Sequence, residues 1–259
     1  MTASNITMPA LFVGHGSPMN AIENNPATEG WRAAAAALPK PRAILCVSAH
    51  WETRGVFVCS NPHPETIHDF YGFPQPLFDV RYPAPGDPAL AHRIAGLVHG
   101  THVRETRDWG LDHGAWSVLR VMFPQADVPV VQLSLDTSQP GSFHLGLARE
   151  LAPLRDEGVL IVASGNIVHN LRLWNWHNPA PSDWAVRANA VVRDRIAAGD
   201  TAALADWPAF GADVALAVPT PEHYLPLLYV LGARRDGEKI EIFNEIVSSS
   251  IAMTSVRVG

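Results

Sequence analysis

Residues 159–163 read VLIVA, the most continuous apolar run in the chain, and Ser164-Gly165-Asn166 follow at once. A short apolar run bounded by turn-forming residues is typical of a buried strand. Residues 10–13 (ALFV) and 43–47 (AILCV) share this pattern, and stretches with helical spacing alternate with the three runs. Buried strands that alternate with helices predict an α/β domain and disfavour a β-sandwich or a helical bundle.

The remaining elements follow from the same periodicity and from the positions of proline and glycine. Residues 56–59 follow 43–47 closely, so these two strands are expected to be neighbours, as in a hairpin. Residues 99–114 are expected to be mainly a polar loop. Further strands are expected at residues 128–135, 240–246 and 251–258. Helices are expected at residues 26–38, 88–98, 115–122, 143–154, 183–198 and 222–231.

Residues 61–88 are crowded with proline, glycine and aromatic residues, which excludes a long helix there. A long ordered loop is a common place for binding residues. Two interpretations are open: the loop is a surface excursion whose rings pack on the core, or it forms a wall of a binding pocket. In the second case we expect pocket-lining rings from this loop and from a Trp-rich loop further on, namely Phe70, Tyr71, Phe73, Trp174 and Trp176.

Composition excludes several classes of protein. The 259 residues are 47% hydrophobic and 17% charged, which excludes a disordered chain. Lys and Arg total 19 against 25 Asp and Glu, and they form no cluster, so we expect no nucleic-acid partner. The apolar runs are far shorter than the roughly 20 residues of a membrane span, so we expect no membrane partner.

Two further features bear on compartment and organisation. The only cysteines are Cys46 and Cys59, with no CxxC spacing, and residues 1–8 lack the basic start and apolar run of a secretory signal. We therefore expect a cytoplasmic protein. Because the chain has no internal repeat, linker or break in composition, residues 1–259 are expected to form a single domain.

Histidine carries most of the functional information. His15, His50 and His169 each come shortly after one of the three buried runs, and His113 and His223 lie in tight segments rich in Gly or Pro. One histidine after a strand is more often a polar residue at the edge of the core than a ligand. Three of them at strand ends predict a shared site, because strands hold such groups rigidly at one edge of a sheet.

Imidazole is the commonest nitrogen ligand of zinc and is also common for iron, so the first hypothesis is a mononuclear metal site. Other chemistry lacks its motif: the chain has no G-x-S-x-G, H-E-x-x-H, G-x-G-x-x-G or P-loop sequence. The other seven histidines lack a comparable setting and are not expected to be ligands: His63, His68, His92, His99, His102, His144 and His177.

Five separated motifs, which together span nearly the whole chain, resemble the 4,5-DOPA extradiol dioxygenase family, a branch of the class III or LigB-type extradiol ring-cleavage dioxygenases. They are Gly14-His15-Gly16-Ser17-Pro18, Ser48-Ala49-His50-Trp51, Asp112-His113-Gly114, Ser164-Gly165-Asn166-Ile167-Val168-His169-Asn170-Leu171 and His223-Tyr224-Leu225-Pro226-Leu227. The resemblance implies a single catalytic α/β domain with a mixed central β-sheet flanked by helices.

The resemblance also implies roles for the five histidines. His15, His50 and His223 bind the metal; His169 is the acid/base and lies close enough to complete a zinc coordination sphere when no substrate is bound. His113 contacts substrate or oxygen. The implied reaction is ring cleavage of a small-molecule catechol such as L-DOPA with O2, in which His169 takes a catechol proton and later returns it.

The expected metal ligands of this chain differ from those of the wider superfamily, which uses two histidines and a glutamate. Here the matching position is His223, with Glu222 beside it, as in the DOPA-type branch. Three imidazoles suit zinc well, so one metal ion per chain is expected, Fe(II) for activity or Zn2+ as bound in the purified protein.

Two alternatives use the same histidines. A zinc hydrolase would activate a metal-bound water and turn over without oxygen. A non-catalytic metal- or tetrapyrrole-handling protein is suggested by the His-Gly-Ser that follows the first strand, a single motif that the other four do not support. The sequence leaves open the physiological catechol, the ring bond that is cleaved, the native metal and the oligomeric state.

Overall fold

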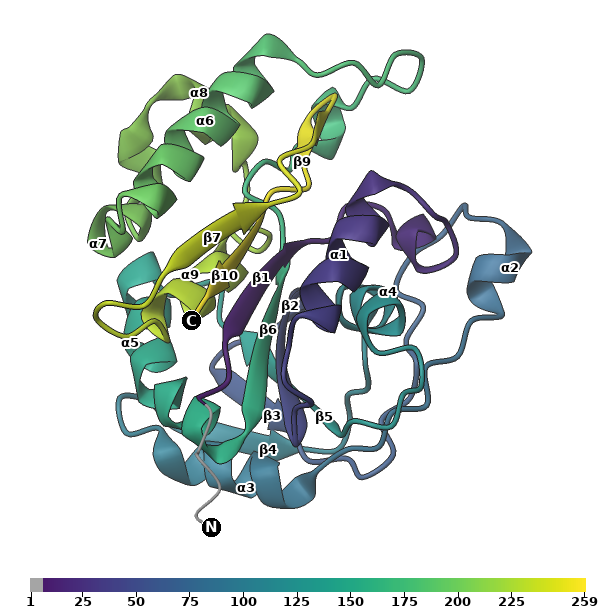
Figure 1. The fold of residues 1–259 in the computed structure, drawn as a ribbon, viewed down its shortest axis with the longest axis vertical. Coiled ribbons are helices and arrows are strands. Elements are labelled where there is room, and N and C mark those ends of the chain that lie inside the picture. The colour runs from purple at the N-terminus through teal and green to yellow at the C-terminus, as the bar shows by residue number, and fades with distance from the viewer. Residues whose placement is uncertain (1–6) are drawn as a thin grey trace.

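The computed structural model describes residues 7–259, so residues 1–6, part of the stretch considered above for secretion, lie outside it. A single eight-stranded sheet forms the centre of the molecule (Figure 1). Its strands are β1 (Ala10–Gly14), β2 (Ala43–Glu52), β3 (Val56–Cys59), β4 (Val103–Thr106), β5 (Val130–Leu135), β6 (Val159–Gly165), β7 (Ile240–Phe243) and β10 (Ser255–Val258). A separate two-stranded ribbon pairs β8 (Val247–Ser248) with β9 (Ile251–Ala252).

The sheet is mixed, as expected. Its strand order is β4-β3-β5-β2-β6-β1-β10-β7. The central strands β5, β2, β6 and β1 are parallel. At one side β10 is antiparallel to both of its neighbours, β1 and β7, and at the other side β3 is antiparallel to β5. The carboxyl ends of the four parallel strands therefore meet at one edge, where residues that follow them come together.

Helices cover both faces of the sheet (Figure 1). Successive strand residues point to opposite faces of the sheet. Leu11 and Ile44 therefore pack on one side, with Trp31 and Trp116, while Phe12 packs on the other side. The first side holds α1 (Pro26–Ala36) and α4 (His113–Met122); the second holds α3 (Pro88–Leu97), α5 (Gly141–Leu151), α6 (Asp183–Ala197), α8 (Ala212–Ala217) and α9 (Leu225–Gly232).

Short helices make up the rest of the regular structure. They are the 3-10 helices η1 (Pro18–Ala21), η2 (Ala152–Glu157), η3 (Leu171–Leu173) and η4 (Trp207–Phe210), and the one-turn helices α2 (Gln75–Phe78) and α7 (Thr201–Leu204). No helix within residues 7–259 is long and apolar enough to cross a bilayer.

Several expectations about local structure are wrong. Strands β2 and β3 are not neighbours, because β5 lies between them and pairs with both. Part of the expected polar loop forms the edge strand β4, in which only Val103 is buried, so it lacks the apolar pattern of an inner strand. The helix expected from residue 222 begins at Leu225, and the strand expected to reach residue 246 ends at Phe243.

Candidate active site

Three of the five histidines are brought together by the parallel strands. His15 directly follows β1, His169 lies four residues beyond β6, and His50 lies inside β2, close to its end. The sequence placed His50 after its strand, but β2 continues to Glu52 through an irregular register. Because β1, β6 and β2 lie side by side, histidines far apart in the sequence meet at one edge of the sheet.

His113 reaches the same edge because it is the first residue of α4. Asp112 caps this helix by accepting the backbone N–H of Ala115 at 3.1 Å. The buried Asp112 carboxylate also accepts hydrogen bonds from Ser48 and Gln132, so three donors satisfy it. The start of α4 is thereby anchored to the central strands.

His223 is held against the end of β6 by a close backbone contact. The carbonyl of His223 accepts the Asn166 N–H at 2.8 Å. A Cβ at Gly165 would lie 2.2 Å from that carbonyl oxygen, so only glycine permits the approach. The segment before α9 therefore places His223 beside His15 and His50.

The donor atoms of His15, His50 and His223 fit one metal ion. One ring nitrogen of each lies within 4.8 Å of the other two, and the Nε2 atoms of His15 and His50 are 3.2 Å apart. Two nitrogens bound to a tetrahedral ion at about 2.0–2.1 Å would lie roughly 3.3 Å apart. The Nδ1 of His223 lies 3.0 Å from Glu222 Oε1, the partner that typically orients a metal-binding imidazole.

His169 occupies a different position in the cluster. Its ring stacks on that of His223, with centroids 3.5 Å apart and planes inclined by 10°. Its donor atom groups with those of Glu222 and His223, not with the trio of His15, His50 and His223. His169 is therefore next to the candidate metal position without being part of its tightest donor set.

His113 completes the cluster on the other side. Its ring centroid is 3.8 Å from that of His50, and its Nδ1 lies 3.0 Å from Asp69 Oδ2. Asp69 Oδ1 also accepts the backbone N–H of His113 at 2.9 Å. The long loop thus supplies the carboxylate that orients His113.

Burial disfavours the charged form of four of the site histidines, His15, His50, His169 and His223. Desolvation and the neighbouring imidazoles lower the pKa of His15 and of His223 well below the ordinary value. Burial lowers the pKa of His50 to about 3 and that of His169 to about 4. Neutral rings have free lone pairs, so at neutral pH they can bind a cation or accept a proton.

The aromatic loop fits both of its earlier interpretations. Phe70 meets the His113 ring edge to face at a centroid distance of 5.6 Å, so this ring does border the site. Phe73 packs on Phe70 and both rings contact the core. Tyr71 and Trp176 are 92% and 82% exposed, so these two rings do not pack in a closed wall.

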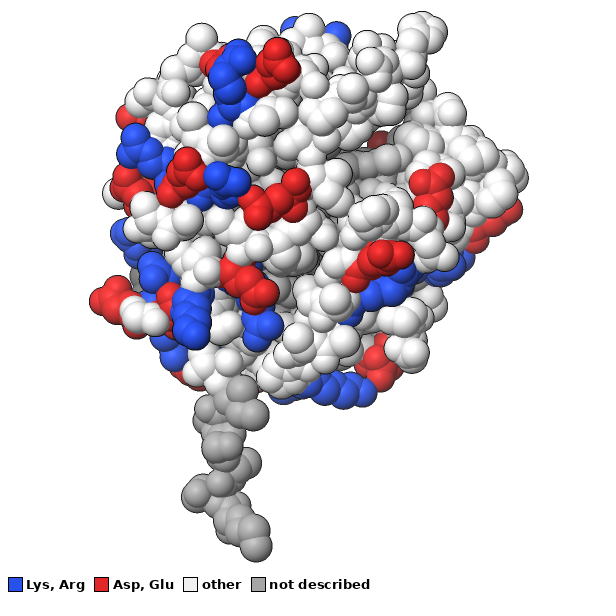
Figure 2. All heavy atoms as spheres, turned by 45° about the horizontal axis from the view of Figure 1, so that its top comes forward, with Lys and Arg blue, Asp and Glu red and all other residues white. Residues whose placement is uncertain are grey.

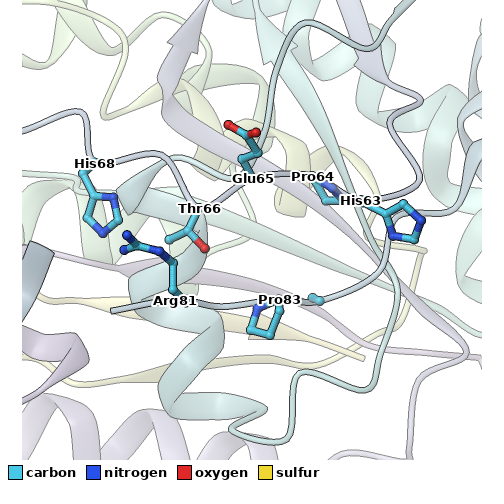
Figure 3. Close-up of a pocket in the computed structure, with 8 residues that line it drawn as sticks. His63, Pro64, Glu65, Thr66, His68, Arg81 and Pro83 are labelled. Atoms are coloured by element: carbon cyan, nitrogen blue, oxygen red, sulfur yellow. The ribbon is translucent and has the colours of Figure 1, made fainter. Parts of the chain in front are cut away.

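The seven histidines not expected to be ligands lie outside the candidate donor groups found among residues 7–259. His63 and His68 line a separate cavity of about 570 Å³ in the long loop, where Arg81 faces His68 and Glu65 points away (Figure 3). His144 is buried within α5. The others are exposed: His92, His99, His102 and His177.

Sequence reasoning missed four residues that surround the histidines. Ser48, Asp112 and Ser164 stood inside motifs that were noted for their histidines, so their nearness in sequence was the available signal. Asp69 had no such signal, because the loop that carries it reaches His113 only in the folded chain.

Surface charge is mixed on the face of the molecule that Figure 2 shows. Figure 2 shows acidic and basic residues interspersed on one face, and a hollow bordered mostly by uncharged side chains. No extended basic patch is visible on this face.

Comparisons with known proteins show what the whole chain is similar to. The sequence model of the family described as "Catalytic LigB subunit of aromatic ring-opening dioxygenase" matches residues 9–258. A 4,5-DOPA dioxygenase extradiol from Escherichia coli is 49% identical, over 99% of this chain and 96% of its own length. One from Beta vulgaris is 38% identical over 90% of each chain. A crystal structure of an uncharacterized Escherichia coli protein superposes with a TM-score of 0.85 at 44% identity, covering 97% of this chain and all of that one.

Proposed function

The chain belongs to the LigB family of aromatic ring-opening dioxygenases, in its 4,5-DOPA extradiol branch, and from this premise we propose that it cleaves a catechol such as L-DOPA with O2. Membership makes it an extradiol ring-cleavage dioxygenase and removes the non-enzymatic alternative. The observation that carries the proposal is the convergence of His15, His50 and His223, with His113 and His169 on either side. Residues 1–259 would act as one catalytic domain.

One mononuclear metal would be held by His15, His50 and His223. Their donor separations and their neutral state support this assignment. The ion, Fe(II) for activity or Zn2+ as the purified protein holds it, would supply a Lewis acid for the catechol oxygens and, as iron, the redox chemistry that O2 requires. An all-imidazole donor set supports retention of zinc during purification.

His169 is proposed as the acid/base. It is neutral at pH 7, since burial lowers its pKa to about 4, so it can accept a proton from a catechol hydroxyl and return it later. Its stacking on His223 keeps it beside the ligands. Its absence from the tightest donor trio favours this role, and a ligand role for His169 is proposed only for the substrate-free zinc form.

His113 is proposed to contact the substrate or oxygen. Asp69 Oδ2 lies 3.0 Å from its Nδ1 and Asp69 Oδ1 accepts its backbone N–H, so the loop carboxylate lies directly against His113. Phe70, which borders His113, offers an aromatic face or edge to a catechol ring.

The proposed partners are a small-molecule catechol and O2, with no nucleic acid and no membrane, and the proposed compartment is the cytoplasm. The excess of acidic over basic residues and the interspersed charges of Figure 2 support the first exclusion.

The deciding experiment is anaerobic reconstitution of the purified chain with Fe(II), followed by L-DOPA with and without O2. We expect O2 uptake and a yellow ring-opened product only when iron, catechol and O2 are all present. A zinc-loaded sample is the matched control and should take up no O2. If a panel of catechols gave no uptake while esters or amides were hydrolysed without O2, the zinc hydrolase would replace the proposal.

A further inference from the structure

Two buried serines lie side by side at the edge of the sheet where the histidines meet. Ser48 of β2 and Ser164 of β6 are direct register partners in the parallel ladder, and both are fully buried. Each precedes a site histidine in its motif, His50 and His169 respectively. Neither serine has a part in the proposed chemistry, so their hydrogen bonds need an explanation.

Both serines bind the same turn, residues 112–114. Ser164 Oγ donates to the Gly114 carbonyl at 2.6 Å, and Ser48 Oγ donates to Asp112 Oδ1 at 2.6 Å. A Cβ at Gly114 would lie 2.4 Å from Ser48 Oγ, so the turn is pressed against β2. The pair therefore fixes the start of α4, whose first residue is His113.

Each serine oxygen also contacts one candidate metal ligand. Ser48 Oγ accepts the backbone N–H of His50 at 3.2 Å. Ser164 Oγ lies 3.0 Å from Nδ1 of His15. The same two hydroxyls thus join the candidate ligands to the turn that carries His113.

The position of one proton follows from these contacts. A serine hydroxyl has a single hydrogen, and a carbonyl oxygen can only accept. The Ser164 hydroxyl therefore donates its hydrogen to the Gly114 carbonyl, and its oxygen must accept a hydrogen bond from Nδ1 of His15. His15 then carries its proton on Nδ1 and keeps an unprotonated Nε2, the atom that faces His50 Nε2 at 3.2 Å.

We propose that Ser164 is a positioning residue that sets the tautomer of His15, so that Nε2 is always free to bind the metal. Ser48, its register partner, positions His50 and the His113 turn without acting on the His15 ring. The consequence for metal binding rests on the proposed function; the tautomer does not.

The test is ¹⁵N NMR of the histidine rings in the metal-free full chain, with the His15 signals assigned from their loss in His15→Gln. We expect the wild type to show His15 protonated on Nδ1. In Ser164→Ala the His15 signals should shift towards a tautomer mixture, while Ser48→Ala should keep the wild-type pattern. A wild-type His15 protonated on Nε2, or equal changes in both variants, would overturn the proposal.

Metal affinity provides the second readout. Competition with a chelator should show zinc binding about 10–100-fold weaker in Ser164→Ala, the usual cost of losing a partner that orients a ligand. Ser134→Ala is the matched control, because Ser134 is a buried serine with hydrogen bonds to Thr53 and Phe57 and no contact to a site histidine. Unchanged affinity in Ser164→Ala would reject the role in metal binding. Absence of any metal binding by the wild type would reject the proposed function instead and leave the tautomer result standing.

Discussion

The histidine cluster at the end of the sheet and the lone His144 in α5 are both largely shielded from solvent, but they differ in the number of side chains that meet there. Burial lowers the pKa of His144 to about 4, the same value that it gives His169. His144 Nδ1 pairs with the Tyr229 hydroxyl at 3.0 Å across the contact of α5 with α9. Among residues 7–259, no group of candidate donors includes it. A shifted pKa therefore reports burial, and only the convergence of several donors marks a site.

The two regions also differ in what holds them. His144 and Tyr229 form one pair within a helix interface, where the Tyr229 hydroxyl is the partner of Nδ1 and the buried Nε2 has no hydrogen-bond partner among the described residues. The histidines of the cluster instead have hydrogen-bonding partners from several strands and loops. The loss of one partner should therefore change the positions of the others.

The largest expected difference comes from removing a ligand. His15→Ala or His50→Ala should abolish metal binding and turnover, because two donors cannot replace three. His144→Gln should keep both, since His144 has no contact with the cluster. Metal content after purification measures metal binding, and O2 uptake after iron loading measures turnover. Metal loss in His144→Gln would contradict the difference between the histidine cluster and His144.

The next largest expected effect distinguishes metal binding from acid/base catalysis within the histidine cluster. His169→Ala should keep most of the metal and lose about 10²–10⁴-fold in kcat, the typical contribution of a general acid/base. Metal analysis beside single-turnover kinetics checks this. Full turnover of a catechol by the variant would mean that the acid/base is another group.

A smaller effect concerns the loop carboxylate. Asp69→Asn should lower turnover about 10-fold, in the range known for partners that orient a functional imidazole, and keep the metal. The reason is that Asp69 holds both the ring and the backbone of His113. Asp127→Asn is the control, because Asp127 pairs with Lys40 on the surface. Equal kcat values for the two variants would show that the carboxylate of Asp69 has no part in positioning His113.

The smallest expected effect is on stability. The folded pKa of His144 is lowered to about 4 while the unfolded value is about 6.5, so the unfolded state binds the proton first as pH falls. As the pH falls from 7 to 5, protonation of His144 in the unfolded state should therefore lower the free energy of unfolding by about 2 kcal/mol. Urea unfolding at both pH values should show that His144→Gln loses less stability than the wild type. Identical pH dependence would mean that His144 titrates alike in both states.

The sequence by itself determined the fold class and the five histidines that meet in the structure. Short apolar runs and helical spacing are local signals, and they were enough to find the central strands β1, β2 and β6. The five motifs around His15, His50, His113, His169 and His223 also indicated the family, because a family is recognised by residues at fixed places along the chain.

Only the tertiary structure decided which elements and side chains meet. Strand β5 separates β2 from β3, and β4 forms at an edge with little apolar pattern, because strand order depends on pairing between distant segments. The same applies to side chains. Asp69 meets His113 through a hydrogen bond, and Ser48 meets Ser164 through strand pairing. No local pattern encodes either contact, since both depend on distance in space and not on separation along the chain.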